Sequence, residues 1–246
     1  MTPTPKSADL GGEDAKRSYV RDLFTAIAPR YDLLNHVLSL NIDRRWRRAA
    51  IRRLGWENAP RGTYLDVCAG TLDLSAELSR QPLFAGKVVG ADFVVPMLLL
   101  GLEKAERLEG VGADALELPF PDETFHGCMV AFGVRNLTDA SAGLAEMARV
   151  LRPGGRLVIL EFSLPSAWPV RPLYLLYFRH VLPRIGRFVS KHTSGYSYLP
   201  ESVREFPAPT RMVARLQEQG LEDVHHEPLS LGIASLYWGT RSRRRP

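Results

Sequence analysis

Residues 63–71, TYLDVCAGT, decide the fold, because they join an apolar run to a turn of small residues and then to a helical pattern. Thr63–Val67 has the length and composition of a buried strand, and residues 72–80 have the spacing of a helix. Small residues in the turn let the backbone approach a ligand, and the N–H groups that open a helix favour negative charge. The stretch therefore predicts a strand–turn–helix unit with a ligand site at the carboxyl end of the strand.

The same alternation of strands and helices continues along most of the chain. Helices are expected over residues 96–108, 140–151 and 209–220, and further strands over residues 87–91, 111–113, 127–132, 156–162, 222–228 and 232–240. Such alternation favours a mostly parallel sheet with helices on both faces, and strands that are apolar throughout are typical of burial on both sides. We therefore expect an α/β, Rossmann-like fold with a seven-stranded sheet.

The N-terminal region has a purely helical pattern. Residues 1–15 are rich in Pro, Gly and charge, which predicts disorder. Residues 16–60 are expected to form a helical cap, in which Pro29 splits the first helix and Asp43 caps a second helix over residues 43–54. The polar face of this second helix is expected to carry the basic run RRWRR.

A second irregular region, residues 163–207, interrupts the alternation after the strand that ends at Phe162. It is rich in Tyr, Leu, Pro and Arg and has no acidic residue as far as position 200. We interpret it as an inserted helical segment that faces substrate or a membrane, since an apolar helix with basic edges can lie at a lipid surface; core packing is the alternative. Residues 16–240 then form a single domain, followed by a basic tail over residues 241–246.

The composition is that of a globular protein. Of 246 residues, 45% are hydrophobic and 24% charged, which excludes a disordered, collagen-like or coiled-coil chain. Cys68 and Cys128 are far apart and have no neighbouring His pair, so neither a disulfide framework nor a metal site is indicated. The longest apolar stretch, residues 93–102, is too short to cross a membrane, and we expect a cytoplasmic location. The net charge of +5 is compatible with nucleic acid, anionic lipid or an anionic substrate and does not choose among them.

Acidic residues follow three successive predicted strands, at the same edge of the sheet. Asp66 ends the first strand shortly before Gly70, Asp92 ends the second, and Asp114-Ala115 follows the third. Carboxylates at this edge can accept hydrogen bonds from a ribose diol or an adenine amino group. Neither the GxGxxG motif of NAD sites nor a P-loop is present, so the pattern favours a nucleoside cofactor without phosphates, S-adenosylmethionine. The structural alternative is a turn with solvated carboxylates.

Longer stretches point to a particular family. They are YDLLNHVLSLNIDRRWRR, LDVCAGTLDL, LPFPDETFHG, AFGVRNLTD, RVLRPGGRLVILEFSLP, YSYLPESVREFP and GIASLYWG. With them the chain resembles the ubiquinone/menaquinone biosynthesis C-methyltransferases (UbiE/MenG type) from about residue 19 to residue 239. FGVRN and YSYLPESVREFP are specific to that family, whereas the order of AGT, AD, DA and RPGG is common to class I methyltransferases.

The resemblance implies a class I S-adenosylmethionine-dependent methyltransferase that methylates a ring carbon of a reduced, prenylated demethylquinone. Demethylmenaquinol is the first choice of acceptor, and a benzoquinol of ubiquinone biosynthesis is the alternative. The cofactor residues implied by the resemblance are Thr71, Asp92, Asp114 and Ala115, and the pattern at the strand ends adds Asp66 and Gly70. Ala131 completes the set, at a position where some relatives have a serine near the cofactor. Asp43 and Leu72 depart from the family pattern, which usually has His at the first position and often Gly or Ala at the second.

The implied reaction requires a well-positioned carbon nucleophile and stabilisation of a quinolate. Arg135 in FGVRN follows the fourth predicted strand, and because a guanidinium stays protonated we expect it to hold a quinol oxygen; a surface ion pair is the alternative. Tyr31 is the second catalytic candidate and could cap the substrate together with Asn35, or pack in the core. His180 and His192 are suited to take a proton, but a lone histidine is more often a structural donor, so no general base is assigned.

A prenylated quinol resides in a membrane, so we expect transient contact with the inner face of the membrane, helped by the basic residues. A homodimer is compatible with the sequence, and we expect no metal and no nucleic acid. Three other functions stay open. One is methylation of another small apolar molecule, such as a sterol or polyketide. A second is nucleic-acid methylation. Methyltransferases that act on amino groups of bases usually have the motif [DNS]-P-P-[YFW] after the fourth strand, and the loop GVRN at this position lacks it. The third is a catalytically weak scaffold, to which the departures at Asp43 and Leu72 would point.

Overall fold

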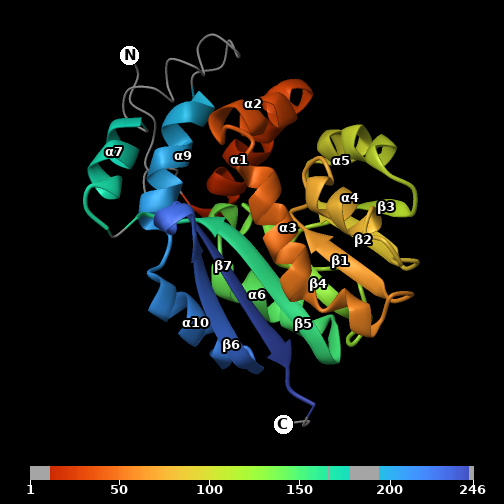
Figure 1. Ribbon diagram of the computed structural model, residues 1–246. Coiled ribbons are helices and arrows are strands. Elements are labelled where there is room, and N and C mark those ends of the chain that lie inside the picture. Colours follow the sequence, from red (N-terminus) through yellow and green to blue (C-terminus); the bar gives the residue numbers. More distant parts are fainter. Residues whose placement is uncertain (1–11, 166, 178–193, 244–246) are drawn as a thin grey trace.

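The computed structural model describes residues 12–165, 167–177 and 194–243. Seven strands form one sheet in the order β3-β2-β1-β4-β5-β7-β6, with helices against both faces (Figure 1). Strands β1 to β5 run parallel, whereas β7 is antiparallel to its neighbours β5 and β6. The strands are β1 (Thr63–Val67), β2 (Lys87–Asp92), β3 (Leu108–Gly112), β4 (Phe125–Ala131), β5 (Leu151–Phe162), β6 (Leu221–Leu229) and β7 (Ala234–Arg241). The expected α/β fold with a mostly parallel seven-stranded sheet is confirmed.

The helices precede and connect these strands. They are α1 (Glu13–Ile27), α2 (Tyr31–Leu38), α3 (Asp43–Leu54), α4 (Asp73–Ser79), α5 (Val95–Gly101), α6 (Ala140–Arg149), α7 (Val170–Leu176), α9 (Ser194–Glu205) and α10 (Pro209–Glu218). Pro29 lies in a short 3-10 turn between α1 and α2, so the split expected at this proline is confirmed. The prediction of disorder is wrong for residues 13–15, because they form the first turn of α1, where Lys16 N–H donates to the carbonyl of Gly12 at 3.1 Å.

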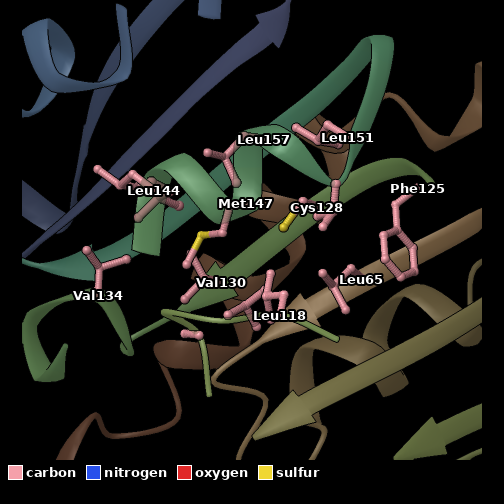
Figure 2. Close-up of a cluster of buried hydrophobic side chains, with 14 of the residues drawn as sticks. Leu65, Leu118, Phe125, Cys128, Val130, Val134, Leu144, Met147, Leu151 and Leu157 are labelled. Carbon is pink, nitrogen blue, oxygen red and sulfur yellow. The ribbon is translucent and has the colours of Figure 1, made fainter. Parts of the chain in front are cut away.

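Alternate residues of the central strands point to opposite faces of the sheet and build two cores. On one face, Leu65 of β1 and Val130 of β4 pack with Met147 of α6 (Figure 2). On the other face, their chain neighbours Tyr64 and Met129 pack with the apolar sides of α3 and α4. Burial on both faces explains why these strands are apolar throughout.

The start of α3 differs from the prediction. Asp43 does not cap the helix: Ile42 precedes it, and the buried Asp43 carboxylate accepts a charge-assisted hydrogen bond from Arg47 one turn later. Trp46 and Arg47 are buried, so the run RRWRR is not one solvated polar face. The tertiary position of the helix, which lies against the sheet, overrides the local capping preference.

The helix expected over residues 96–108 is also shorter than predicted. It ends as α5 at Gly101, a 3-10 turn follows, and Leu108 already begins β3 by pairing with Val88 of β2. The helical spacing of the sequence cannot show that α5 ends at Gly101, because the pairing of β3 with β2 involves residues that are distant in the chain.

The inserted region after β5 contributes α7 and α9 to the structure. Residues 178–193, and with them His180 and His192, lie outside the described residues, as do residues 244–246 of the basic tail. Within the part of the chain that the structure describes, no helix is long and apolar enough to span a membrane.

Candidate active site

The turn after β1 brings its backbone to the carboxyl ends of β1 and β2. Gly70 has a φ of +52°, a conformation that favours glycine, and its N–H donates to Oδ2 of Asp92 at 2.8 Å. The N–H of Val94 donates to Oδ1 of the same carboxylate, also at 2.8 Å. Burial raises the pKa of Asp92, while these two backbone bonds favour its ionised form. The carboxylate at the end of β2 is therefore held in one orientation.

Five of the seven residues assigned to the cofactor from the sequence line one cavity, which we call the cofactor cavity. They are Gly70, Asp92, Asp114, Ala115 and Ala131. Apolar walls come from Phe93, Met97 and Leu116. Carboxylates from two neighbouring strands, separated by apolar walls, suit an adenosyl group, because the carboxylates can accept bonds from ribose hydroxyls and an amino group while the flat base packs on the walls. The residues present thus fit S-adenosylmethionine.

Helix α1 closes this cavity. Arg17 of α1 forms an ion pair with Oδ2 of Asp114, while the N–H of Leu116 donates to Oδ1 at 2.9 Å. Val20 and Phe24 of the same helix also line the cavity. Its volume is about 60 Å³, well below the roughly 300–1,000 Å³ of most small-molecule sites. Helix α1 therefore narrows the cavity in this conformation.

Thr71 and Asp66, the other two cofactor candidates, do not line the cavity. The hydroxyl of Thr71 donates to the carboxylate of Asp32 on α2. Asp66 is fully buried and accepts bonds from the N–H of Ser75 at 3.1 Å and from its hydroxyl at 2.6 Å. Burial raises the pKa of Asp66 to about 7. Thr71 thus bonds to α2 and Asp66 to Ser75 of α4, whereas the family resemblance assigned Thr71, and the pattern at the strand ends Asp66, to the cofactor.

A larger, mainly apolar cavity of about 480 Å³ adjoins the cofactor cavity, and we call it the acceptor cavity. Phe24, Tyr31 and Phe132 line both cavities, so they lie where the two meet. The polar side chains in the wall of the acceptor cavity include Tyr31, Asn35, Arg47 and Arg135. Tyr31 and Arg135, the two catalytic candidates, are thus brought to one cavity.

Arg135 is held at this cavity by Glu161 of β5. Its Nη1 donates to the Glu161 carboxylate and to the carbonyl of Phe132, the latter at 2.6 Å. Glu161 is fully buried and also accepts the backbone N–H groups of Arg135 at 3.3 Å and of Phe162 at 2.9 Å. The Arg135 side chain is only 7% exposed, so its ion pair is not a surface pair. Its Nε is buried and has no hydrogen-bond partner among the described residues, so the guanidinium is not fully paired.

Sequence reasoning missed Glu161 and Arg47. A glutamate inside the apolar run RLVILEF was a usable signal for Glu161, because a carboxylate at such a position needs a buried partner. Arg47 gave no such signal, since it stands among other arginines and a tryptophan. No group of three or more metal-ligating side chains occurs among residues 12–165, 167–177 and 194–243.

The sheet order, the antiparallel β7 and the cofactor cavity at the carboxyl ends of the strands define a class I S-adenosylmethionine-dependent methyltransferase. Phosphoethanolamine N-methyltransferase 2 of Haemonchus contortus, solved with S-adenosylmethionine, shares this fold with a TM-score of 0.56 at 14% identity, over 80% of this chain and 52% of that one.

The sequence model of the ubiE/COQ5 methyltransferase family matches residues 12–241. The chain belongs to this family. It is 45% identical to the demethylmenaquinone methyltransferase of Deinococcus radiodurans, over 94% of this chain and 96% of that protein. It is 43% identical to the ubiquinone/menaquinone biosynthesis C-methyltransferase UbiE of Geobacter sulfurreducens, over 92% of this chain and 90% of that protein.

Proposed function

We propose that this methyltransferase methylates a ring carbon of a reduced, prenylated quinone, with demethylmenaquinol as the acceptor. The observation that supports this most directly is the acceptor cavity. Its volume of about 480 Å³ is in the usual range for small-molecule sites, and its walls are mainly apolar with a few polar side chains. A prenylated quinol has a matching composition, with an apolar tail and a ring that carries two oxygens. The name of the Deinococcus radiodurans relative agrees with this acceptor.

Arg135 is assigned the quinolate oxygen. A neutral quinol is a weak carbon nucleophile, and loss of its hydroxyl proton moves electron density onto the neighbouring ring carbon. The Arg135 guanidinium stays protonated, so it cannot take that proton, but it can stabilise the oxygen anion that remains. Its burial strengthens this effect, because little water screens the charge. When bound, S-adenosylmethionine would supply an electrophilic methyl group and leave as S-adenosylhomocysteine. The methylated carbon would then lose its proton to water, which makes the ring aromatic again.

Tyr31 is assigned to positioning the ring between the two cavities. Burial raises the pKa of Tyr31 above its ordinary value, although Asn35 and the positive charge of Arg135 act in the opposite direction. The phenol therefore keeps its proton at neutral pH and can donate it in a hydrogen bond to a quinol oxygen. Tyr31 also packs edge-to-face on Phe24, with ring centroids 5.9 Å apart, which holds the side chain at the boundary.

The test is methyl transfer from labelled S-adenosylmethionine to a short-chain demethylmenaquinone, with and without dithionite, beside a benzoquinone that lacks the same methyl group. Label in the naphthoquinone only under reducing conditions supports the proposal. Label in the benzoquinol alone moves the assignment to ubiquinone biosynthesis, and label in neither refutes a quinone acceptor. In the same assay Arg135→Met should lower kcat by about 10²–10³-fold, as loss of a donor to a developing oxyanion does.

We further propose that the mouth of the acceptor cavity rests on an anionic lipid surface. Leu40, Leu173 and Leu231 line this cavity and are 77%, 63% and 74% exposed, so they form an apolar rim. Arg44 and Arg45 at the start of α3 are exposed close to Leu40 in the chain. Exposed leucines with nearby cations are typical of proteins that enter a headgroup layer.

Sedimentation with phosphatidylglycerol vesicles tests this contact. The double variant Leu40→Asp, Leu231→Asp should lose vesicle binding, whereas Leu83→Asp, at a leucine that is 89% exposed but does not line the cavity, should keep it. Equal binding by both variants would contradict the assignment. A homodimer stays a prediction, which sedimentation equilibrium checks.

A further inference from the structure

The acceptor cavity contains a second buried guanidinium, that of Arg47 on α3. Its side chain is 7% exposed, as is that of Arg135. Nη1 of Arg47 pairs with Asp43, and Nη2 lies 3.2 Å from a carboxylate oxygen of Asp73. Its Nε, like that of Arg135, is buried and has no hydrogen-bond partner among the described residues. Two buried arginines with an unpaired donor each, both lining one mainly apolar cavity, need an explanation, because a buried donor without a partner loses its hydration without compensation.

Both arginines lie beside the same aromatic pair. The rings of Phe132 and Phe162 stack with their centroids 4.4 Å apart. The guanidinium carbon of Arg47 lies 5.9 Å from the Phe132 centroid, and that of Arg135 lies 5.3 Å from the Phe162 centroid. The positive charges of both act on the hydroxyl of Tyr31. Both cations therefore lie beside one stacked aromatic pair, and both rings of that pair line the acceptor cavity.

The two guanidiniums differ in how far their charge is compensated. Among the described residues, Arg135 has one carboxylate partner, Glu161, whereas Arg47 has two, Asp43 and Asp73. Arg135 is therefore the better partner for an anionic oxygen. Arg47 is suited to donate to an oxygen that stays protonated, because its positive charge is already balanced.

We propose that Arg47 binds the second ring oxygen of the acceptor, para to the oxygen held by Arg135, and so makes the cavity specific for a ring with two para oxygens. This inference rests on the proposed function, since it assumes a quinol in the acceptor cavity. A hydroxyl at this position can accept a bond from Arg47 and donate one to Asp43, which also lines the cavity. A ring with a single hydroxyl would leave both buried groups without that partner, and sites of this kind reject such analogues strongly.

A purely structural role is the competing explanation. Arg47 joins α3 to Asp73 at the start of α4, and an arginine that only holds two helices together would not respond to the second oxygen of the acceptor. The two explanations thus differ in one measurable quantity, the dependence of the Arg47 effect on that oxygen.

The experiment combines two acceptors with two enzymes. The acceptors are a prenylated 1,4-dihydroxynaphthalene and the prenylated 1-naphthol that lacks only the second hydroxyl. The enzymes are the wild type and Arg47→Met, with Arg48→Met as a matched control, because Arg48 is on the same helix but its side chain is 56% exposed. Wild type and control should prefer the diol in kcat/KM by about 10–100-fold, as expected for a hydrogen bond to a charged group. Arg47→Met should lose this preference and methylate the naphthol as the wild type does.

Equal losses on both acceptors, or a wild type that does not distinguish them, would overturn the inference while leaving the proposed function intact. Failure of the wild type to methylate the diol refutes the proposed function instead. A binding measurement covers that case. The Kd values for the methylated diol and for its monohydroxy analogue, measured by tryptophan fluorescence, should show that the wild type prefers the diol and that Arg47→Met does not. Should Arg47→Met not fold, Arg47→Lys replaces it, since a compact ammonium lacks the planar fork with which a guanidinium spans two carboxylates and a ring oxygen. An undiminished diol preference in that variant would refute the assignment.

Discussion

Replacing Asp66 by asparagine should change how the stability of the protein depends on pH. Asp66 is 1% exposed, and burial raises its pKa from 3.8 to about 7, with the neighbouring Asp92 adding to the effect. The folded protein therefore holds this proton more tightly than the unfolded chain does. The stability contributed by the protonated carboxyl is fully present below about pH 4 and is lost as the pH rises through 7. At about 1.36 kcal/mol per pKa unit, the difference amounts to about 4 kcal/mol.

The asparagine side chain in Asp66→Asn would keep an oxygen that accepts the two bonds from Ser75, but it cannot ionise. Urea unfolding of this variant and of the wild type, measured from pH 4.5 to 8.5, should show the variant gaining about 3 kcal/mol relative to the wild type, because part of the full difference lies below pH 4.5. Asp223→Asn is the control, because Asp223 is exposed. A constant difference between Asp66→Asn and the wild type would refute the reasoning, since Asp66 would then be ionised in the folded protein throughout.

The same variant also tests where Asp66 acts. Because Asp66 does not line the cofactor cavity, titration calorimetry should give an affinity for S-adenosylmethionine within about twofold of the wild type. A large loss of affinity, without loss of structure, would favour the direct cofactor contact that the sequence pattern suggests.

Three further predictions concern the two cavities. Glu161→Gln removes the carboxylate partner of the buried Arg135 and should lower the free energy of unfolding by about 3–5 kcal/mol in urea; a loss below about 1 kcal/mol would contradict a buried pair. Arg17→Ala frees Asp114 and should raise the association rate constant of S-adenosylmethionine in stopped-flow fluorescence, whereas an unchanged rate would show that α1 does not limit entry. Gly101→Ala would place a Cβ 2.4 Å from a backbone carbonyl oxygen of the turn after β1, so it should cost about 1–3 kcal/mol and lower the melting temperature; an unchanged melting temperature would show that the turn relaxes freely.

Local sequence patterns predicted much of the fold. The strand at Thr63–Val67 and the helix at Asp43–Leu54 have the predicted bounds, and Pro29 splits the first helix as expected. These features depend on residues close together in the chain. The end of α5 and the role of Asp43 were not predictable in this way, because they depend on pairing with β2 and on an ion pair that exists only when α3 lies against the sheet.

The amino-acid sequence by itself determined the class of protein, the family and most of the cofactor cavity, since the carboxyl ends of neighbouring parallel strands meet at one edge and bring Gly70, Asp92 and Asp114 together. Only the tertiary structure added Arg47 to the polar groups of the acceptor cavity and showed what holds Arg135 there. Arg47 and Arg135 come from separate helical elements, and Glu161, which holds Arg135, comes from β5. A charge in an apolar cavity is stable only beside a compensating partner, and here the partner of Arg135 lies 26 positions away in the chain, so no local pattern could identify the pair.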